Sequence, residues 1–209
     1  MVGRIIRTED CVAEGAAWLA AREPQFARAL ARTGPLPLRR REDGFASLLD
    51  AIISQQVSVA SASAIWRRLE AAGLTQAVPL AAAQDEDLRA CGISRQKMRY
   101  ARALAQAGLD YTALRTAPDD AVIATLVAVP GIGRWTAEIY AMFSLGRADV
   151  FAPGDLALQE SARLLFGLDG RPSEKDLRRR AEAWSPWRGV AARLLWAYYR
   201  VAKEREGIR

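Results

Sequence analysis

The chain has 209 residues, a formal net charge of +6, 51% hydrophobic residues, two cysteines and no histidine. This apolar content suffices for a folded core, and the positive charge suits a polyanionic partner such as nucleic acid. The lack of histidine excludes a Ser-His-Asp triad, a Cys-His dyad and most zinc sites, and Cys11 and Cys91 cannot supply the four thiolates of an iron–sulfur cluster. Any catalysis must therefore use carboxylates, arginines, hydroxyls or backbone dipoles.

Nearly every segment predicts a helix, because apolar residues recur at three- and four-residue spacing and Gly or Pro marks the boundaries. No run of alternating β-branched residues competes, so we expect an all-α fold. The predicted helices span residues 9–22, 24–32, 44–57, 59–72, 84–91, 94–107, 119–128, 134–145, 156–166, 173–184 and 187–205. The sequence shows neither a signal peptide nor a membrane span, so the cytoplasm, and the nucleoid if the source is bacterial, is the expected location.

Several helix ends are also legible. Pro24 suits the first turn of its helix, and Ser173 can accept a hydrogen bond from the first amides of a late helix. The segment 33–37, Thr-Gly-Pro-Leu-Pro, predicts a linker between two lobes.

The most informative stretch is 126–137, Leu-Val-Ala-Val-Pro-Gly-Ile-Gly-Arg-Trp-Thr-Ala, which predicts two helices joined by a tight turn. Gly131 and Gly133 allow unusual backbone angles and close approach of another chain, and Ile132 would fill the space between the helices. The amides that open the second helix suit a DNA phosphate of any sequence. The candidate DNA contacts are Gly131, Gly133, Arg134 and Thr136. The alternatives are an ordinary turn between helices, or DNA binding without catalysis.

The segment 145–158 follows, Leu-Gly-Arg-Ala-Asp-Val-Phe-Ala-Pro-Gly-Asp-Leu-Ala-Leu, and its Asp155 opens the next helix. Hairpin, Gly/Pro-rich loop and aspartate together resemble the helix-hairpin-helix DNA glycosylase superfamily, and the resemblance covers most of the chain. It implies that Asp155 is the catalytic carboxylate. The alternative role of Asp155 is a plain helix N-cap, and the two roles are compatible.

Three further segments are similar to the 3-methyladenine DNA glycosylase II branch: 51–60, 92–100 and 184–188. Superfamily members that also nick the backbone carry a lysine two residues after the second hairpin glycine, and its amine forms a Schiff base with the sugar. Trp135 occupies that position here. The resemblance therefore implies a monofunctional enzyme without lyase activity.

The implied substrate is double-stranded DNA that contains an alkylated purine of the 3-methyladenine or 7-methylguanine type. Such a base is positively charged and leaves readily, so an acid such as histidine is not required. Loss of the base develops positive charge on the sugar, which Asp155 would stabilise while orienting a water molecule. The expected activity is hydrolysis of the N-glycosidic bond in base excision repair, leaving an abasic site. The alternatives are a monofunctional glycosylase for deaminated or exocyclic-adduct bases, and a non-catalytic protein that binds damaged DNA.

The base must be flipped out of the helix before it can react. In relatives, a side chain from the loop that matches Ser54-Gln55-Gln56 fills the gap, and a leucine of the best-known relative corresponds to Gln56. Gln55 and Gln56 are therefore candidate DNA contacts. The alternative is a polar surface pair at the end of a helix.

Aromatic side chains would receive the electron-poor base by stacking and cation–π attraction. Trp135 and Trp196 match pocket positions of the relatives, and Tyr140 is a candidate through its place in the motif. Ile139 and Leu156 stand where a relative has tyrosines, which implies a more open pocket with a different base selectivity. Other tryptophans, namely Trp66, Trp184 and Trp187, are expected in the core.

The resemblance also implies two helical lobes that flank a DNA-binding cleft, one of residues 38–145 and one of 1–37 with 146–209. Relatives hold a monovalent cation, Na⁺ or K⁺, on hairpin carbonyls that correspond to Val127, Val129 and Gly131. No other cofactor is expected. Well-known relatives begin with a β-sheet domain that this chain has no room for, so we expect the compact form of the family, acting as a monomer.

Overall fold

The computed structural model describes residues 2–205, so Met1 and 206–209, the outer ends of one predicted lobe, lie outside the described residues. The described chain is helical and contains no β-strand, only an isolated bridge between Ile5 and Arg147, which confirms the all-α prediction. Its helices are α1 (Glu9–Arg22), α2 (Pro24–Thr33), α3 (Phe45–Ile53), α4 (Val59–Ala71), α5 (Ala77–Ala82), α6 (Asp85–Ala90), α7 (Arg95–Gln106), α8 (Tyr111–Thr116), α9 (Asp119–Val127), α10 (Arg134–Phe143), α11 (Leu156–Phe166), α12 (Glu174–Ala181), the 3₁₀ helix η1 (Glu182–Trp184) and α13 (Arg188–Arg205).

The helix boundaries follow the sequence closely except in three places. The short helices α5 and α8, of six residues each, were not predicted, because so few residues show no helical period. The predicted helix 44–57 is too long, since α3 ends at Ile53 and a loop follows as far as Ser58, whose hydroxyl caps α4. Pro24 lies in the first turn of α2 and Ser173 caps α12, as predicted. Over the described part of the chain, no helix has both the length and the apolar run needed to cross a membrane.

The chain divides into two compact units. Unit 1 is Met1–Arg40 with Ala141–Arg209, and unit 2 is Arg41–Tyr140. The sequence placed the first boundary after Pro37, within unit 1. The chain stays attached to unit 1 a few residues longer, because the Leu38 carbonyl accepts hydrogen bonds from the Arg193 guanidinium. The second boundary lies inside α10, not after it at residue 145.

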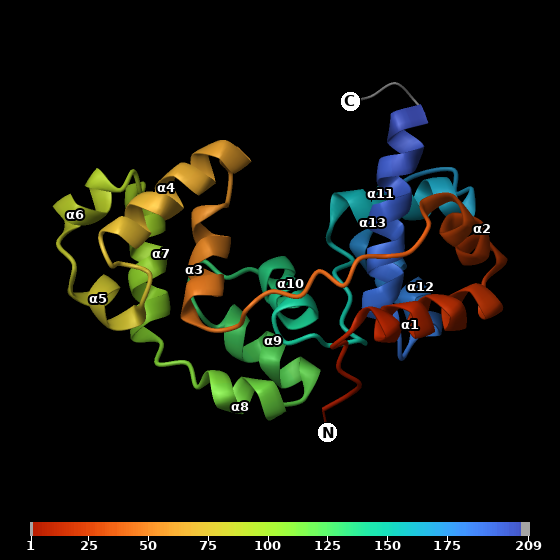
Figure 1. Ribbon diagram of the computed structural model, residues 1–209, viewed down its shortest axis with the longest axis horizontal. Coiled ribbons are helices and arrows are strands. Elements are labelled where there is room, and N and C mark those ends of the chain that lie inside the picture. The colour runs from red at the N-terminus through yellow and green to blue at the C-terminus, as the bar shows by residue number, and fades with distance from the viewer. Residues whose placement is uncertain (1, 206–209) are drawn as a thin grey trace. The chain divides into compact units, whose positions relative to one another are not determined.

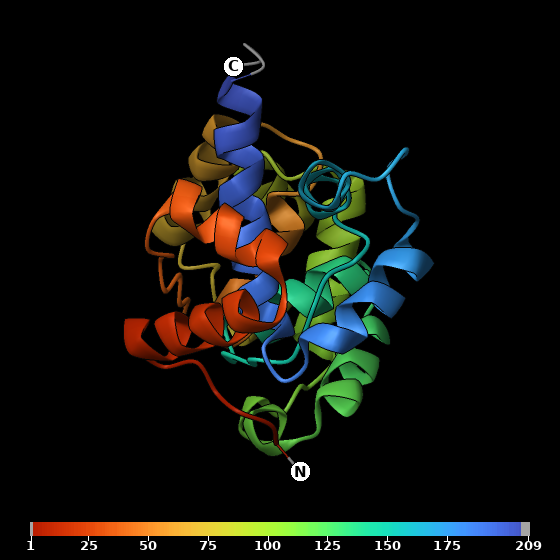
Figure 2. The same ribbon diagram turned by 90° about the vertical axis from the view of Figure 1, so that its right-hand side faces the viewer.

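In unit 1, helices α1, α2 and α11 pack against α13 (Figures 1 and 2). An aromatic cluster fills the interior beside them, where Trp184 meets the rings of Phe26, Phe151 and Phe166. Gly15 lets α1 approach closely, because a Cβ there would lie 2.6 Å from the Trp187 ring. Both Trp184 and Trp187 are buried in the core, as predicted. The same prediction is wrong for Trp66, which is only partly buried on α4, where its indole N–H donates to Glu70.

The loop between α10 and α11 is fastened to the start of α13. The Gly189 amide donates to the Ala148 carbonyl at 2.7 Å, and a Cβ on Gly189 would lie 2.9–3.2 Å from three loop carbonyls. Asp149 accepts two hydrogen bonds from the Arg188 guanidinium, at 2.8 and 2.9 Å, and one from the Ser185 hydroxyl at 2.7 Å. These contacts set the path of the chain that leads to Asp155.

In unit 2, α3 and α5 pack against α7 (Figure 1). The apolar face of α3 is fully buried, through Leu48, Leu49, Ile52 and Ile53.

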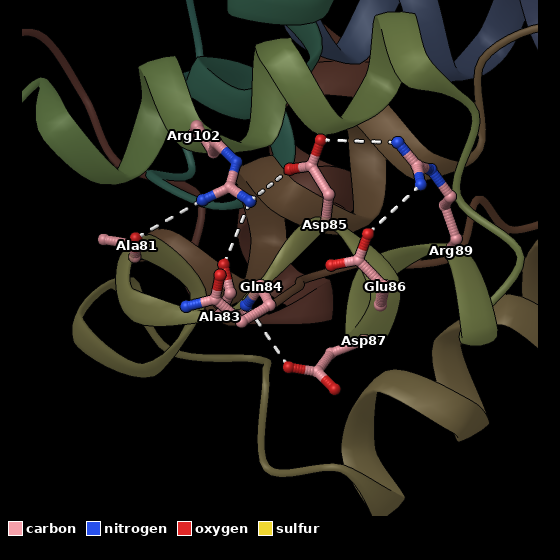
Figure 3. Close-up of polar contacts among 8 residues, drawn as sticks. All are labelled: Ala81, Ala83, Gln84, Asp85, Glu86, Asp87, Arg89 and Arg102. Atoms are coloured by element: carbon pink, nitrogen blue, oxygen red, sulfur yellow. Dashed lines mark hydrogen bonds and ion pairs between the residues drawn. The ribbon is translucent and has the colours of Figure 1, made fainter.

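A polar network holds the short helices α5 and α6 against α7 (Figure 3). Arg102 of α7 donates to the Ala83 carbonyl at 2.9 Å and to Asp85 at 2.6 Å. The Gln84 amide in turn donates to Asp87, which completes a capping box at the start of α6. The network satisfies the carbonyls that end α5, which explains how so short a helix is stabilised.

The close approach at Gly189 generates a stability prediction. We expect Gly189→Ala to lower the free energy of unfolding by about 1–3 kcal/mol, because the new methyl group overlaps three backbone carbonyls that cannot move independently. Denaturant titration followed by circular dichroism measures the change. The matched control is Gly170→Ala, where a Cβ meets no atom within 4 Å. Equal stability of the two variants would contradict the prediction.

Candidate functional site

The hairpin joins α9 to α10 through a turn with Ile132 in its interior. Ile132 is buried, as its position between the glycines predicts, and its amide donates to the Val129 carbonyl at 3.0 Å. Gly131 has a φ of +94°, and a Cβ there would lie 2.4 Å from Cγ of Tyr100. Gly131 is therefore required both for its backbone conformation and for the aromatic ring of α7 packed on it.

Gly133 differs from Gly131. Its φ lies outside the left-handed region, and a Cβ there would meet nothing within 4 Å in the protein. The structure thus gives no internal reason for glycine at this position. Its open side leaves room for a close approach from outside, directly at the start of α10.

The first turn of α10 carries the remaining hairpin candidates. Its first intrahelical bond runs from the Ala137 amide to the Gly133 carbonyl at 3.0 Å, so the preceding amides lie at the positive end of the helix dipole. Arg134 is exposed, and its Nε donates to the buried Glu138 carboxylate at 3.0 Å. Thr136 is buried, so little of its surface is accessible to a ligand in this structure.

Glu138 is a residue that the sequence analysis missed. Its side chain is 3% exposed and lies one turn after Arg134. A carboxylate at i+4 from an arginine at the start of a helix is the signal that could have revealed it. It orients the guanidinium at the same helix end as the Gly133 opening.

The loop after α3 presents the two glutamines differently. The Gln55 side chain donates through Nε2 to the Gly131 carbonyl at 3.0 Å, which ties the loop to the hairpin. Gln56 is exposed and has a φ of +56°, a left-handed conformation that is uncommon for a residue with a Cβ. Gln55 therefore braces the loop, and Gln56 stands at its exposed tip.

The three carbonyls implied as cation ligands are partly engaged within the protein. Val129 accepts from the Ile132 amide and Gly131 from Gln55. A carbonyl oxygen has two lone pairs, so both remain compatible with a monovalent cation as a further partner. Among the described residues, no group of three or more Cys, Asp or Glu side chains could hold a metal ion.

Asp155 is the N-cap of α11. Its Oδ1 accepts from the Ala157 amide at 2.9 Å and from the Leu158 amide at 3.0 Å. The same oxygen accepts from the indole Nε1 of Trp196 at 3.2 Å. Three N–H donors on one oxygen hold the carboxylate in a single orientation, so capping and a precise placement of the carboxylate occur together.

The loop before Asp155 is braced from within unit 1. The Asp155 amide donates to the Ala152 carbonyl at 3.0 Å, closing a turn that contains Pro153 and Gly154. The buried Gln159 side chain donates to the Pro153 carbonyl at 2.9 Å. Gln159 was also missed by the sequence analysis, because a polar residue inside a predicted helix gives no sign of a partner on the preceding loop.

Trp196 lies on α13 and is packed as well as hydrogen-bonded. The centre of its ring lies 5.7 Å from that of the Phe143 ring. The buried Arg193 guanidinium lies 4.7 Å from the centre of the same Phe143 ring. Burial lowers the pKa of Arg193 to about 10, with a further contribution from Arg39 and Arg40. The structure thus brings Trp196 and Asp155 together, as two of the predicted site residues.

The other two aromatic candidates lie in unit 2. Trp135 is 48% exposed, so its indole offers a face to a ligand. Tyr140 is 5% exposed, and its hydroxyl accepts from the Gly44 amide at 2.9 Å. Burial raises the pKa of Tyr140 to about 12. In this structure Tyr140 therefore offers little ring surface to a base and serves as a buried anchor for the segment before α3.

The comparisons with known proteins cover most of the chain. Residues 49–186 match the model of the HhH-GPD superfamily of base excision DNA repair proteins. DNA-3-methyladenine glycosylase 1 of Schizosaccharomyces pombe is 29% identical over 178 residues, which are 81% of this chain and 78% of the relative.

Two solved structures share the fold. The DNA-3-methyladenine glycosidase of Bacillus halodurans superposes with a TM-score of 0.82 at 35% identity, over 89% of each chain. The 3-methyladenine DNA glycosylase of Schizosaccharomyces pombe, in complex with abasic DNA, superposes with a TM-score of 0.74 at 27% identity, over 88% of this chain and 95% of that one. From the glycine hairpin, the capped aspartate and these matches together, we conclude that the chain belongs to the HhH-GPD superfamily of base excision DNA repair proteins.

Proposed function

We propose that this protein is a monofunctional DNA glycosylase that releases alkylated purines, of the 3-methyladenine and 7-methylguanine type, from double-stranded DNA. The observation that carries the proposal is the Asp155 carboxylate, held by two helix amides and the Trp196 indole in a chain whose relatives are named 3-methyladenine glycosylases. The product is an abasic site.

Asp155 supplies the chemistry. Departure of the base leaves positive charge on the deoxyribose, and a fixed carboxylate stabilises that charge more in the transition state than in the substrate. Because Oδ1 is fixed by three N–H donors, the carboxylate need not reorganise as the charge develops. It can also orient the water that attacks the sugar.

The enzyme must recognise the leaving base, but it need not protonate it. An alkylated purine is cationic, and tryptophan is the best partner for a cation over an aromatic face. The exposed indole of Trp135 suits that role, while Trp196 serves Asp155 through its N–H. Leu156, 61% exposed and next to Asp155, presents an aliphatic side chain where a relative has tyrosine, which favours a more open pocket with a different base selectivity.

The hairpin supplies a sequence-independent grip on DNA. The open side of Gly133 and the amides at the start of α10 suit a phosphate oxygen, and Arg134 adds a positive charge oriented by Glu138. Phosphate contacts of this kind position the protein without reading the base sequence. A repair enzyme that must search all sequences benefits from that property.

The proposed reaction uses one carboxylate, one flipping loop and one hairpin, and a single chain carries all three. We therefore propose a monomer that requires no cofactor and acts on DNA in the cytoplasm, with Na⁺ or K⁺ on the hairpin carbonyls as a structural ion.

The central test is Asp155→Asn. Asparagine is as good an N-cap as aspartate, so we expect the fold and the DNA affinity to persist, the affinity within a few-fold. We expect base release to fall by at least about 100-fold, because the negative charge is lost. Methylated DNA is incubated with each protein, and the released bases are separated by chromatography. Full activity of the variant would sink the proposed mechanism, and release of a deaminated or adduct base instead by the wild type would favour the alternative substrates.

The second test separates the indole N–H of Trp196 from its ring. Trp196→Phe keeps an aromatic ring on Phe143 but removes the donor to Asp155, so we expect about tenfold slower single-turnover base release with DNA affinity little changed. The matched control is Trp66→Phe, which removes an indole donor to the Glu70 carboxylate, at 2.8 Å, in unit 2. Equal release rates of the Trp196 variant and the wild type would show that this hydrogen bond does not position Asp155.

The third test concerns the absent lyase step. Because Trp135 stands where lyase-active relatives have lysine, we expect the wild type to leave abasic DNA intact and to form no adduct that borohydride can trap. Gel electrophoresis of the DNA and of the protein after reduction measures both. A trapped complex would mean that another amine attacks the sugar.

A further inference from the structure

One contact in unit 2 lies outside the functions assigned so far. Lys97 of α7 places its Nζ 2.6 Å from the carbonyl oxygen of Ile53, the last residue of α3. The carbonyls that end a helix have no partners within it and carry its negative dipole end, so an ammonium group there is doubly favoured. Burial lowers the pKa of Lys97, which shows that the ammonium is partly removed from water at this position.

The sequence marks this position too. Of the 30 basic residues only Lys97, Lys175 and Lys203 are lysines, so the chain keeps a lysine here against a strong preference for arginine. A compact ammonium group fits a single carbonyl at a helix end, whereas the planar guanidinium fork is built for two acceptors.

The hydrogen bond from Lys97 to Ile53 lies at the start of the loop that carries Gln56. The loop begins directly after Ile53, and its next tie is the hydrogen bond from Gln55 to the Gly131 carbonyl. A hollow of about 210 Å³ adjoins the loop, lined among others by Gln55, Gln56, Lys97 and Tyr100. Since the loop borders a hollow on this side, the hydrogen bonds of Lys97 and Gln55 contribute to its position.

Helix α7 contacts both elements that hold the 54–57 loop, the end of α3 and the hairpin. Lys97 binds the end of α3, and Tyr100, one turn later on α7, packs its ring on Gly131 of the hairpin. Helices α3 and α7 lie side by side in unit 2 (Figure 1). Gln56 keeps its left-handed φ of +56°, an unfavourable conformation that persists only where the surroundings enforce it.

We propose that Lys97 is a positioning residue for base flipping: through the Ile53 carbonyl it fixes the root of the 54–57 loop, so that Gln56 is presented for insertion into the DNA. The proposal rests on the proposed function, since it names a residue that prepares the same reaction. Lys97 does not touch the substrate, and its effect is confined to the step in which the base leaves the stack. The loop is preorganised by this contact, which spares the ordering that insertion would otherwise require.

The test compares Lys97→Met, which keeps the apolar stem but removes the donors, with Lys175→Met, the same change at an exposed position on α12. Single-turnover base release is measured on a duplex with one 7-methylguanine, paired with cytosine or facing an abasic site. A base without a partner is easier to flip. We expect Lys97→Met to release the paired base about tenfold more slowly and the unpaired base at nearly the wild-type rate, as loss of a charge-assisted tie predicts. Lys175→Met should match the wild type on both.

A merely structural role for Lys97 would slow both substrates equally, and that result, like an unchanged rate on the paired substrate, overturns the proposal. Lys97→Arg covers the case in which the methionine variant does not fold: it restores the charge but not the compact head, and should show a smaller defect with the same dependence on pairing. If Lys97→Arg shows a defect of equal size on both substrates, the proposal is wrong.

Flipping is also measured without chemistry. A 2-aminopurine placed at the lesion position becomes fluorescent when it unstacks, and we expect Lys97→Met to reduce the increase on binding for the paired base only. If the wild-type protein unstacks the base but releases no alkylated base, the proposed function is wrong. The fluorescence comparison of the wild type with Lys97→Met still tests the role of Lys97 in that case. A wild type that binds DNA without unstacking, or a variant that unstacks the paired base as well as the wild type does, refutes the role of Lys97.

Discussion

The approach of Gly189 to the carbonyls of the α10–α11 loop is the constraint on which the placement of Asp155 in unit 1 depends. It allows the backbone of α13 to lie directly against the loop, and the Arg188–Asp149 pair closes beside it. The same helix then carries Trp196, two turns later, to the Asp155 carboxylate. The loop, the helix cap and the indole donor are thereby all positioned by α13. A side chain on a loop is then held as firmly as one on a helix.

Unit 2 has an equivalent arrangement around α7, which holds the hairpin and the end of α3. Tyr100 occupies the space that Gly131 leaves free, and Lys97 holds the end of α3. The hairpin and the loop with Gln56 are far apart in the sequence, and each is held by the same helix and also by the Gln55 bond between them. In both units, therefore, a glycine that permits close approach is combined with a few polar ties. The side chains to which the proposed function gives a role in substrate contact therefore stand on elements that are already ordered.

Asp155 caps α11 in a way that is compatible with the catalytic role proposed for it. The two helix amides and the indole that make it a cap also fix its orientation, because all three bind the same oxygen. Preorganisation of a charge costs stability in many sites, but here the cap itself supplies the ordering. Capping and catalysis are alternative but compatible roles for an aspartate at this position, and the structure provides the cap together with the fixed carboxylate that the proposed reaction requires.

The sequence by itself determined the all-α class, most helix bounds and the hairpin, because these depend on periodicity, on caps such as Pro24 and Ser173, and on local glycine spacing. It also singled out Asp155, whose position after the hairpin is a local motif. Only the tertiary structure decided which side chains support these groups. Glu138 could have been read from its spacing to Arg134, but Lys97 at Ile53, Trp196 at Asp155 and Gly189 at the loop join residues about 40 positions apart. It also separated Tyr140, buried, from Trp135, exposed, which the sequence had grouped together. The physical reason is that burial and long-range pairing depend on how helices pack against one another. The spacing of apolar residues along a single helix shows which face is buried, but not which neighbouring helix covers that face.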